Sequence, residues 1–142
     1  MKKLFNIIIS LILFLIVLAA SCRDNDTYHT SLNGKWTLVG FGDDSTGSFI
    51  SEPHSEPMSC SILFDNGKLD AFSVTNRTFD VTYIVKDETI IYINSGIITL
   101  VGGDTEWGQK FLLALKSIYK FNNMSNDLIL YYDNQKFMKL KK

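Results

Sequence analysis

The segment MSCSILFDNGKLDAFSV, residues 58–74, decides how the middle of this chain folds. Apolar and polar side chains alternate on both sides of Asn66-Gly67, a pattern typical of half-buried strands. Asn-Gly favours a tight hairpin turn because both central residues of such a turn need positive φ. The segment therefore predicts two antiparallel strands, 58–64 and 68–74, with Cys60 on the core face beside Ile62 and Phe64.

The alternation continues on both sides of this hairpin. Phe79, Val81, Tyr83 and Val85 predict one half-buried strand, which turns at Asp87-Glu88. Short connections make its neighbours antiparallel. The other predicted strands are 34–41, 89–94, 97–101 after a turn at 95–96, 119–121, and a last hairpin of 127–132 and 136–140. Residues 42–57 contain both prolines and predict one long surface loop.

One helix is predicted after Gly102-Gly103, with Asp104 as its N-cap and Glu106 in its first turn. An apolar stripe then recurs with helical spacing at Trp107, Phe111, Ala114, Leu115 and Ile118. Such a stripe packs on a sheet or docks a partner. We predict an α+β fold in which a strongly curved or barrel-like antiparallel sheet of about eight strands carries one packed helix.

The N-terminus has the features of a secretory signal, since a basic start is followed by the apolar run 4–20. A retained membrane span is the alternative. The run ends in Leu18-Ala19-Ala20-Ser21-Cys22, which resembles a bacterial lipobox. In that family the cysteine receives a diacylglycerol and becomes the first residue of the mature chain. We therefore predict a signal peptide over residues 1–21 and lipid attachment at Cys22.

Residues 22–31 predict a flexible tether because they are too polar to pack. The acidic stretch 23–27 resembles tracts that direct lipoproteins of double-membraned bacteria to the outer face of the outer membrane. We predict a lipid-anchored protein of the outer membrane, with the cell surface favoured over the periplasmic face.

Size and charge limit the function classes. Residues 32–142 are enough for one domain. Cleavage would remove Lys2 and Lys3 from the 14 basic residues and none of the 15 acidic ones, so a basic footprint for nucleic acid is absent. The closing lysines, Lys139, Lys141 and Lys142, could face anionic lipid head groups, but a frayed cationic tail is the more common arrangement and is the one that we predict.

Several framework positions resemble the META domain family, which includes the bacterial heat-shock protein HslJ. The run Leu32-Asn33-Gly34-Lys35-Trp36-Thr37-Leu38 keeps the family's opening Leu, Gly and Trp. A helix with Glu106, Phe111 and Leu115, a strand at Tyr119 and a final hairpin through 128–130 follow in the family's order. The resemblance covers about residues 31–140 and implies a compact β-rich domain, often lipid-anchored or secreted and associated with stress tolerance.

This chain departs from the family at two motifs. Residues 74–77 are Val-Thr-Asn-Arg where many members have Gly-Cys-Asn-Arg, and residues 99–103 lack the family's Thr-x-Met-Ala-Cys. Both family cysteines are therefore missing. The family implies no catalytic residue that could be transferred to this chain.

Side chains that could carry chemistry are few. Cys60 is predicted to be a buried, inert thiol, and His29 and His54 lack metal-ligand spacing. Two acidic pairs, Asp43-Asp44 and Glu52 with Glu56, have the composition of a solvated loop. We predict no enzyme activity, metal or cofactor. Asp44-Ser45-Thr46 resembles an O-glycosylation motif of exported bacterial proteins, which makes Ser45 a candidate modification site.

Three functional hypotheses follow. The first is a non-enzymatic envelope lipoprotein with a stress-related binding or structural role toward an unknown envelope or surface protein. The second is a lipocalin-like carrier that holds a small apolar ligand in its curved sheet. The third is a protein inhibitor, for example of a protease, that presents loop 42–57. The packing of the large aromatic side chains distinguishes the first two hypotheses.

Overall fold

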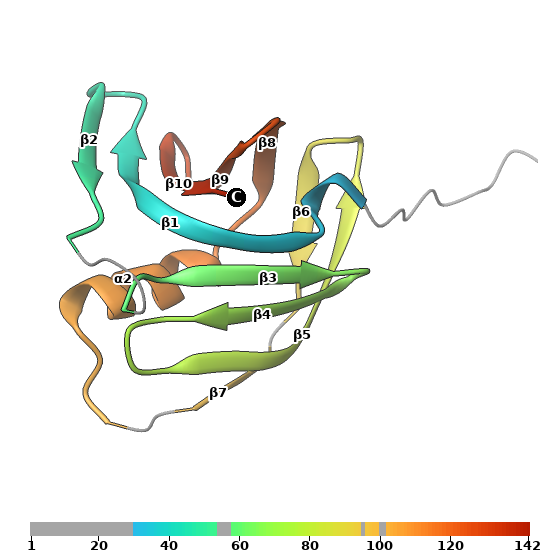
Figure 1. Ribbon diagram of the computed structural model, residues 1–142. Helices are drawn as coiled ribbons and strands as arrows, with labels where there is room; N and C mark the ends of the chain where they lie inside the picture. Colours follow the sequence, from blue (N-terminus) through green and yellow to red (C-terminus); the bar gives the residue numbers. More distant parts are fainter. Residues whose placement is uncertain (1–29, 54–57, 95, 100–101) are drawn as a thin grey trace, which may run out of the picture.

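The structure is a computed structural model that describes residues 30–53, 58–94, 96–99 and 102–142 (Figure 1). The predicted signal peptide, Cys22, both histidines and Glu56 lie outside these residues. Within them, no helix has the length and apolar character needed to cross a bilayer. The elements are η1 (Thr30–Leu32), β1 (Gly34–Asp43), β2 (Ser48–Ser51), β3 (Ser61–Asp65), β4 (Lys68–Phe72), β5 (Arg77–Lys86), β6 (Ile90–Ile93), β7 (Ile97–Ile98), α2 (Glu106–Leu115), β8 (Lys120–Met124), β9 (Asp127–Asp133) and β10 (Lys136–Lys141).

Eight strands form a closed antiparallel barrel in the order β1, β3, β4, β5, β6, β8, β9, β10. The barrel closes because β10 pairs with β1 from Thr37↔Lys141 to Asp43↔Lys136. Closure leaves these strands without a free edge along their paired lengths. The predicted α+β fold with a curved or barrel-like sheet and one helix is confirmed.

The predicted loop 42–57 is wrong in its first half. β1 continues to Asp43, and β2 pairs back onto it from Asp43↔Ser48 to Gly40↔Ser51 (Figure 1). The connecting turn is closed by local hydrogen bonds, because the Asp43 carboxylate accepts from the Ser45 backbone N–H at 2.9 Å. A polar sequence therefore forms a hairpin here, since Asp and Ser side chains satisfy the turn's own backbone.

The turns of two hairpins follow their local sequence. Asn66 and Gly67 have φ of 46° and 87°, and Asp87 and Glu88 have φ of 50° and 62°. Both turns were predicted, the first because Asn-Gly tolerates positive φ. β3 and β4 are accordingly in register from Ser61↔Phe72 to Asp65↔Lys68.

The predicted alternation of β5 is interrupted by a bulge at Asp80, whose φ is 57°. The extra residue turns Phe79 away from the interior, and Thr78 is buried in its place. The Thr78 hydroxyl accepts the Ala71 backbone N–H at 3.0 Å, which satisfies part of the interrupted ladder. β7 pairs with this end of β5 and not with β6.

The helix begins one residue later than predicted. Thr105 is the N-cap, and its hydroxyl accepts the Gly108 backbone N–H at 3.0 Å. Asp104 instead accepts hydrogen bonds from Ser73 and from the Asn76 side-chain amide, the latter at 3.0 Å. The predicted cap residue therefore ties the start of α2 to the connection between β4 and β5.

α2 covers one end of the barrel. Its buried residues include Phe111, Ala114 and Leu115, as predicted, while Ile118 is buried beyond the helix end. Trp107 packs against Phe41 of β1 with ring centroids 5.0 Å apart. Leu112 and Leu115 line a cavity together with Val81 of β5 and Ile93 of β6, so the helix also faces these two strands.

Large side chains fill the barrel interior. Trp36 and Tyr83 are fully buried, Phe64 packs edge to face on Tyr83 with centroids 5.1 Å apart, and Phe111 closes the helix end. The Trp36 indole N–H donates to the Leu32 carbonyl at 2.6 Å, which fixes η1 across the start of β1. Burial of four aromatic rings in one core contributes much of the stability of a domain this size.

The C-terminus is not the frayed tail that we predicted. Lys139 and Lys141 belong to β10, and the Lys142 backbone N–H donates to the Asn126 carbonyl at 3.1 Å. Leu140 between them is fully buried. Closure of the barrel by β10 therefore holds these lysines at fixed positions on the surface.

Candidate functional site

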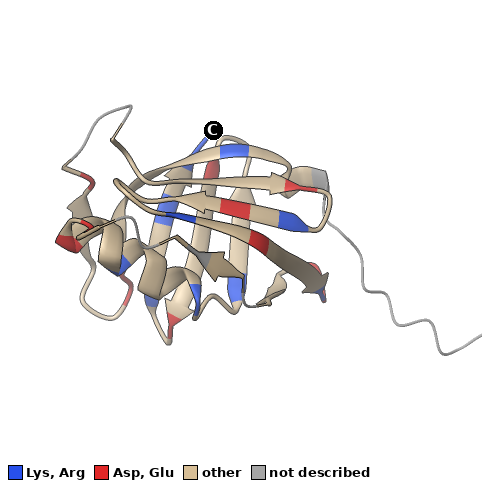
Figure 2. Cartoon of the chain, turned by 90° about the horizontal axis from the view of Figure 1, so that it is seen from below, with Lys and Arg blue, Asp and Glu red and all other residues tan. Residues whose placement is uncertain are grey.

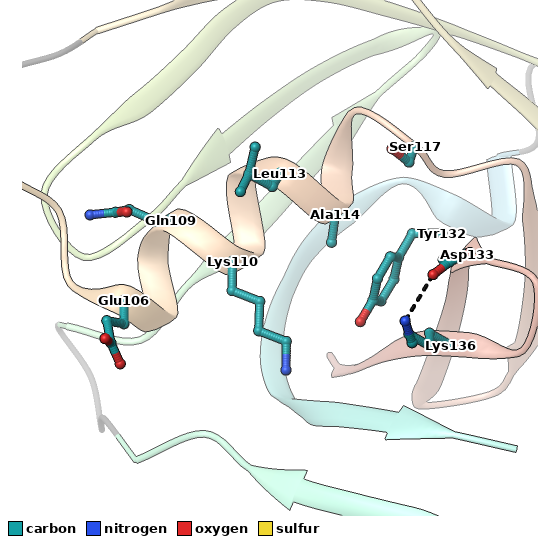
Figure 3. A pocket seen from close by; sticks show the side chains of 9 residues that line it. All are labelled: Glu106, Gln109, Lys110, Leu113, Ala114, Ser117, Tyr132, Asp133 and Lys136. Carbon is teal, nitrogen blue, oxygen red and sulfur yellow. Dashed lines mark hydrogen bonds and ion pairs between the residues drawn. The ribbon is translucent and has the colours of Figure 1, made fainter. Parts of the chain in front are cut away.

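A groove with a volume of about 730 Å³ lies between α2 and the β9–β10 hairpin (Figure 3). Residues on the solvent-facing side of α2 form one wall of the groove, and residues of the β9–β10 hairpin form the other. The groove is lined by Glu106, Gln109, Lys110, Leu113, Ala114, Ser117, Tyr132, Asp133 and Lys136.

Lys110 lies in an aromatic corner of this groove. Its ammonium is 4.3 Å from the ring centroid of Phe41 and 5.7 Å from that of Trp107. Tyr132 packs edge to face on Phe41 at 6.0 Å and completes the corner. Among the described residues no carboxylate pairs with Lys110, so the aromatic faces are the main groups that stabilise its charge.

The electrostatics of the corner favour an incoming anion. Burial lowers the pKa of Lys110, and the nearby positive charge of Lys136 lowers it further. A negatively charged group placed between these two lysines would relieve both effects, since it interacts favourably with each ammonium. Lys110 and Lys136 therefore form the cationic part of the groove.

Two of the other charged groups of the groove, Lys136 and Asp133, compensate each other, and the carboxylate of Glu106 is exposed in its lining. Lys136 pairs with Asp133 at 2.9 Å, and this hydrogen bond raises the pKa of Lys136 (Figure 3). Burial raises the pKa of Tyr132 and keeps its phenol protonated at neutral pH. Leu113 is 66% exposed and adds an apolar side chain at the rim. The groove thus offers the ammonium of Lys110, which no carboxylate of the described residues pairs with, beside apolar surface.

A second recess of about 740 Å³ continues the groove past the β9–β10 turn. It contains Ser45, the candidate glycosylation site, which is exposed and whose hydroxyl donates to the Asp43 carboxylate. That hydrogen bond is the largest cause of the lowered pKa of Asp43. The Tyr119 hydroxyl donates to the Asn134 carbonyl at 2.6 Å and supports the wall of the recess.

Of the two acidic pairs, Asp43-Asp44 and Glu52 with Glu56, the structure describes every member except Glu56. Asp43 serves the turn between β1 and β2, and Glu52 accepts a hydrogen bond from the Trp107 indole N–H. Glu52 thereby joins the end of β2 to the first turn of α2. Among the described residues, three or more His, Cys, Asp or Glu side chains nowhere gather in a metal-binding arrangement.

Cys60 is fully buried, as its place on the core face predicted. Burial raises the pKa of its thiol, and the carboxylates of Glu52 and Asp104 add to the effect. A thiol with a raised pKa is a poor nucleophile, because the thiolate is the reactive form.

A smaller cavity of about 270 Å³ lies where α2 meets β5 and β6. Its apolar wall is made by Val81, Ile93, Leu112 and Leu115, and Thr78, Asn94, Gly96 and Lys116 complete the lining. Unlike the barrel interior, this space is not filled by side chains. It is large enough for a small apolar ligand but below the usual range for drug-sized molecules.

Sequence reasoning missed the groove. The helical spacing identified the apolar stripe of the helix and assigned no role to Lys110, and Tyr132 was predicted only as the end of strand 127–132. One local signal was available, since Tyr132 continues the inward alternation of Leu128 and Leu130 directly before a charged turn.

Comparison with known proteins supports the fold of this chain but does not assign the chain to a family. No protein-family model matches the chain, and no curated protein matches it. A DUF4847 family protein from Bacteroides vulgatus ATCC 8482 shares 15% identity and a TM-score of 0.57, with 79% of this chain and 94% of that chain covered. A protein from Burkholderia xenovorans solved by NMR shares 18% identity and a TM-score of 0.63, with 85% and 92% covered. At these identities the similarity concerns the fold alone.

Proposed function

We propose that this domain is a non-enzymatic binding protein of the bacterial envelope, anchored by lipid at Cys22, that holds its partner in the groove between α2 and the β9–β10 hairpin. The observation that carries the proposal is the Lys110 corner, where an ammonium held against aromatic rings faces open space without a carboxylate partner among the described residues. The closed barrel with its helix is compatible with a binding or structural role.

The chemistry of the groove favours an acidic segment of a neighbouring envelope protein. A carboxylate of the partner would approach Lys110 and Lys136, while an adjacent apolar side chain would cover Leu113. A charge pair that is partly shielded from water contributes to specificity as well as affinity. A binding role also agrees with the buried thiol of Cys60 and the protonated phenol of Tyr132, neither of which is activated for catalysis.

Crosslinking in intact cells tests the groove. A photoreactive amino acid at Gln109, which is exposed on the groove wall, should give a discrete adduct, and the same probe at Lys68 on the far side of the barrel should not. Charge reversal by Lys110→Glu should reduce the Gln109 adduct about ten-fold or more, because it places a like charge against the partner's acid. Equal adducts from Gln109 and Lys68, or no effect of Lys110→Glu, would exclude the groove as the contact.

The anchor and its location are tested separately. Labelled palmitate should enter the wild-type chain and not Cys22→Ala, and protease added to intact cells should digest the domain if it lies on the cell surface. The exposed position of Ser45 in the β1–β2 turn supports O-glycosylation there, and Ser45→Ala should then remove the glycan mass from the mature protein.

The cavity beside α2 supports a second candidate function, the carriage of a small apolar ligand. Its wall of Val81, Ile93, Leu112 and Leu115 would exclude water from such a ligand. A fluorescent apolar probe should bind the wild-type mature chain, and Val81→Trp should abolish binding by filling the space. Binding that survives Val81→Trp would place the probe elsewhere. The inhibitor hypothesis and the META resemblance stay predictions.

A further inference from the structure

Strands β8, β9, β10 and β1 present a surface that is distinct from the groove. Both charge signs are interspersed over the molecule as a whole (Figure 2). The outward positions of these four strands nevertheless carry an excess of positive charge, since they hold Lys35, Lys120, Lys139 and Lys141 against the carboxylate of Asp127. We call this surface the basic face.

Aromatic rings extend the basic face in a row across five strands. The register aligns Lys120 with Tyr131, Tyr131 with Phe137, Phe137 with Gly42, and Gly42 with Phe49 of β2. The Lys120 ammonium is 5.6 Å from the Tyr131 ring centroid. The Phe137 ring is 5.9 Å from that of Tyr131 and 6.4 Å from that of Phe49.

Two glycines make this row flat. A Cβ at Gly42 would lie 2.1 Å from Cζ of Phe137, and a Cβ at Gly40 would lie 2.6 Å from Cζ of Phe49. The two rings therefore rest directly on the backbone of β1 from opposite sides, with an angle of 25° between their planes. Phe49 remains 45% exposed, so the outer surface of this platform is apolar.

Carboxylates near the basic face are largely compensated. Asp127 pairs with Lys139 at 2.9 Å, and Asp44 contacts the Tyr131 hydroxyl at the hairpin end. Lys141 is exposed, and Lys35 and Lys120 are exposed on the neighbouring strands. Ordered lysines around an apolar platform match a surface that combines negative charge with apolar material.

The N-terminal tether enters the domain at the border of this same face. The side-chain amide of Asn123 in β8 donates to the Ser31 carbonyl at 3.0 Å, so η1 is fixed beside β8 and β1. Seven residues separate Cys22 from Thr30. The eight steps from Cys22 to Thr30 span at most about 29 Å when the chain is fully extended. A lipid on Cys22 would thus hold the basic face close to the head groups.

We propose that the basic face docks on the anionic lipid head groups of the membrane that carries the anchor, with its lysines toward the charges and the rings of Phe49 and Phe137 toward the interface. The proposal rests on the proposed anchor at Cys22 for its geometry, while the surface itself binds without the lipid. Docking in this way leaves the groove on the helix side of the barrel directed toward neighbouring proteins.

The test uses the mature chain, residues 22–142, with Cys22→Ser, so that any membrane binding comes from the protein surface. Sedimentation with phosphatidylcholine vesicles, with and without phosphatidylglycerol, measures the partition coefficient. The chain should bind only vesicles that contain phosphatidylglycerol, and added salt should weaken the binding. The triple variant Lys35→Gln, Lys120→Gln and Lys141→Gln should lose about 100-fold, or about five-fold for each lysine.

The matched control removes the same charge from other surfaces by Lys68→Gln, Lys86→Gln and Lys116→Gln, and it should lose less than about five-fold. Equal losses in the two triple variants, or no binding to phosphatidylglycerol, would overturn the proposal. So would binding to a soluble acidic polysaccharide with the vesicles left unbound. If the first triple variant does not fold, the proposal is tested by the partition coefficient of the single variant Lys120→Gln and by the salt dependence of vesicle binding by the wild type. Palmitate labelling tests the anchor at Cys22 independently of vesicle binding. The proposed anchor and the proposed docking of the basic face can therefore be disproved one without the other.

Discussion

Replacing Phe111 with alanine should lower the free energy of unfolding by about 3–5 kcal/mol, since it empties a fully buried position under the helix. The loss combines the transfer of a large apolar side chain to water with the cavity that remains between α2 and the barrel. Urea denaturation of the mature chain measures it.

Leu113→Ala is the control, because it truncates another apolar side chain of the same helix to alanine at a position where that side chain is 66% exposed. We expect a change within about 0.5 kcal/mol there. Similar losses at Phe111 and Leu113 would show that the helix does not cover the barrel end in solution, and the groove and the cavity beside α2 would then have no fixed wall.

Asp104→Ala should cost about 2–3 kcal/mol of unfolding free energy, the second largest effect expected. The carboxylate accepts hydrogen bonds from Ser73 and Asn76 near the β4–β5 connection and from the Thr105 backbone N–H at 2.9 Å. Alanine would leave these donors without their shared acceptor. Glu106→Ala, at an exposed position two residues later, should cost less than about 1 kcal/mol.

The same carboxylate predicts a pH dependence. Burial raises the pKa of Asp104, but hydrogen bonds from Ser73, Asn76, Thr75 and the Thr105 backbone outweigh it, and the folded-state pKa lies below the ordinary value. An ordinary aspartate has a pKa of about 3.9, so the stabilisation is complete above this pH and is lost as the pH falls through the lower folded-state value. Asp104→Asn should therefore lose less stability between neutral pH and pH of about 2 than the wild type. If the free energy of unfolding depends on pH in the same way for both proteins, the lowered pKa of Asp104 in the folded state would be contradicted.

Local sequence was sufficient where neighbouring residues determine the backbone. Asn66-Gly67 and Asp87-Glu88 form the turns that their chemistry favours, because positive φ is a property of the residues themselves. The inward faces of β3 and of the second half of β5 followed from alternation, and the buried side of α2 followed from the spacing of Phe111, Ala114 and Leu115.

Sequence reasoning failed where the outcome depended on partners elsewhere in the chain. The bulge at Asp80 moves Thr78 to the interior, which a strict alternation could not indicate. Thr105 caps the helix because Asp104 is held by Ser73 and Asn76, about 30 residues earlier. The hairpin of β1 and β2 was not predicted. Its polar side chains form hydrogen bonds to the backbone of the turn, but they were interpreted as an open loop.

The sequence by itself determined the strands other than β2, two hairpin turns, the helix and its buried stripe, since these depend on residues a few positions apart. Only the tertiary structure decided that β10 returns to β1, where Thr37 pairs with Lys141 across the whole length of the domain. That pairing places Lys139 and Lys141 beside the aromatic row, and it brings Lys136 to Lys110 at the groove. Contacts between residues that are distant in the sequence have an entropy cost of loop closure, and only the packing of the entire core compensates for it. No local pattern of residues could therefore specify these contacts.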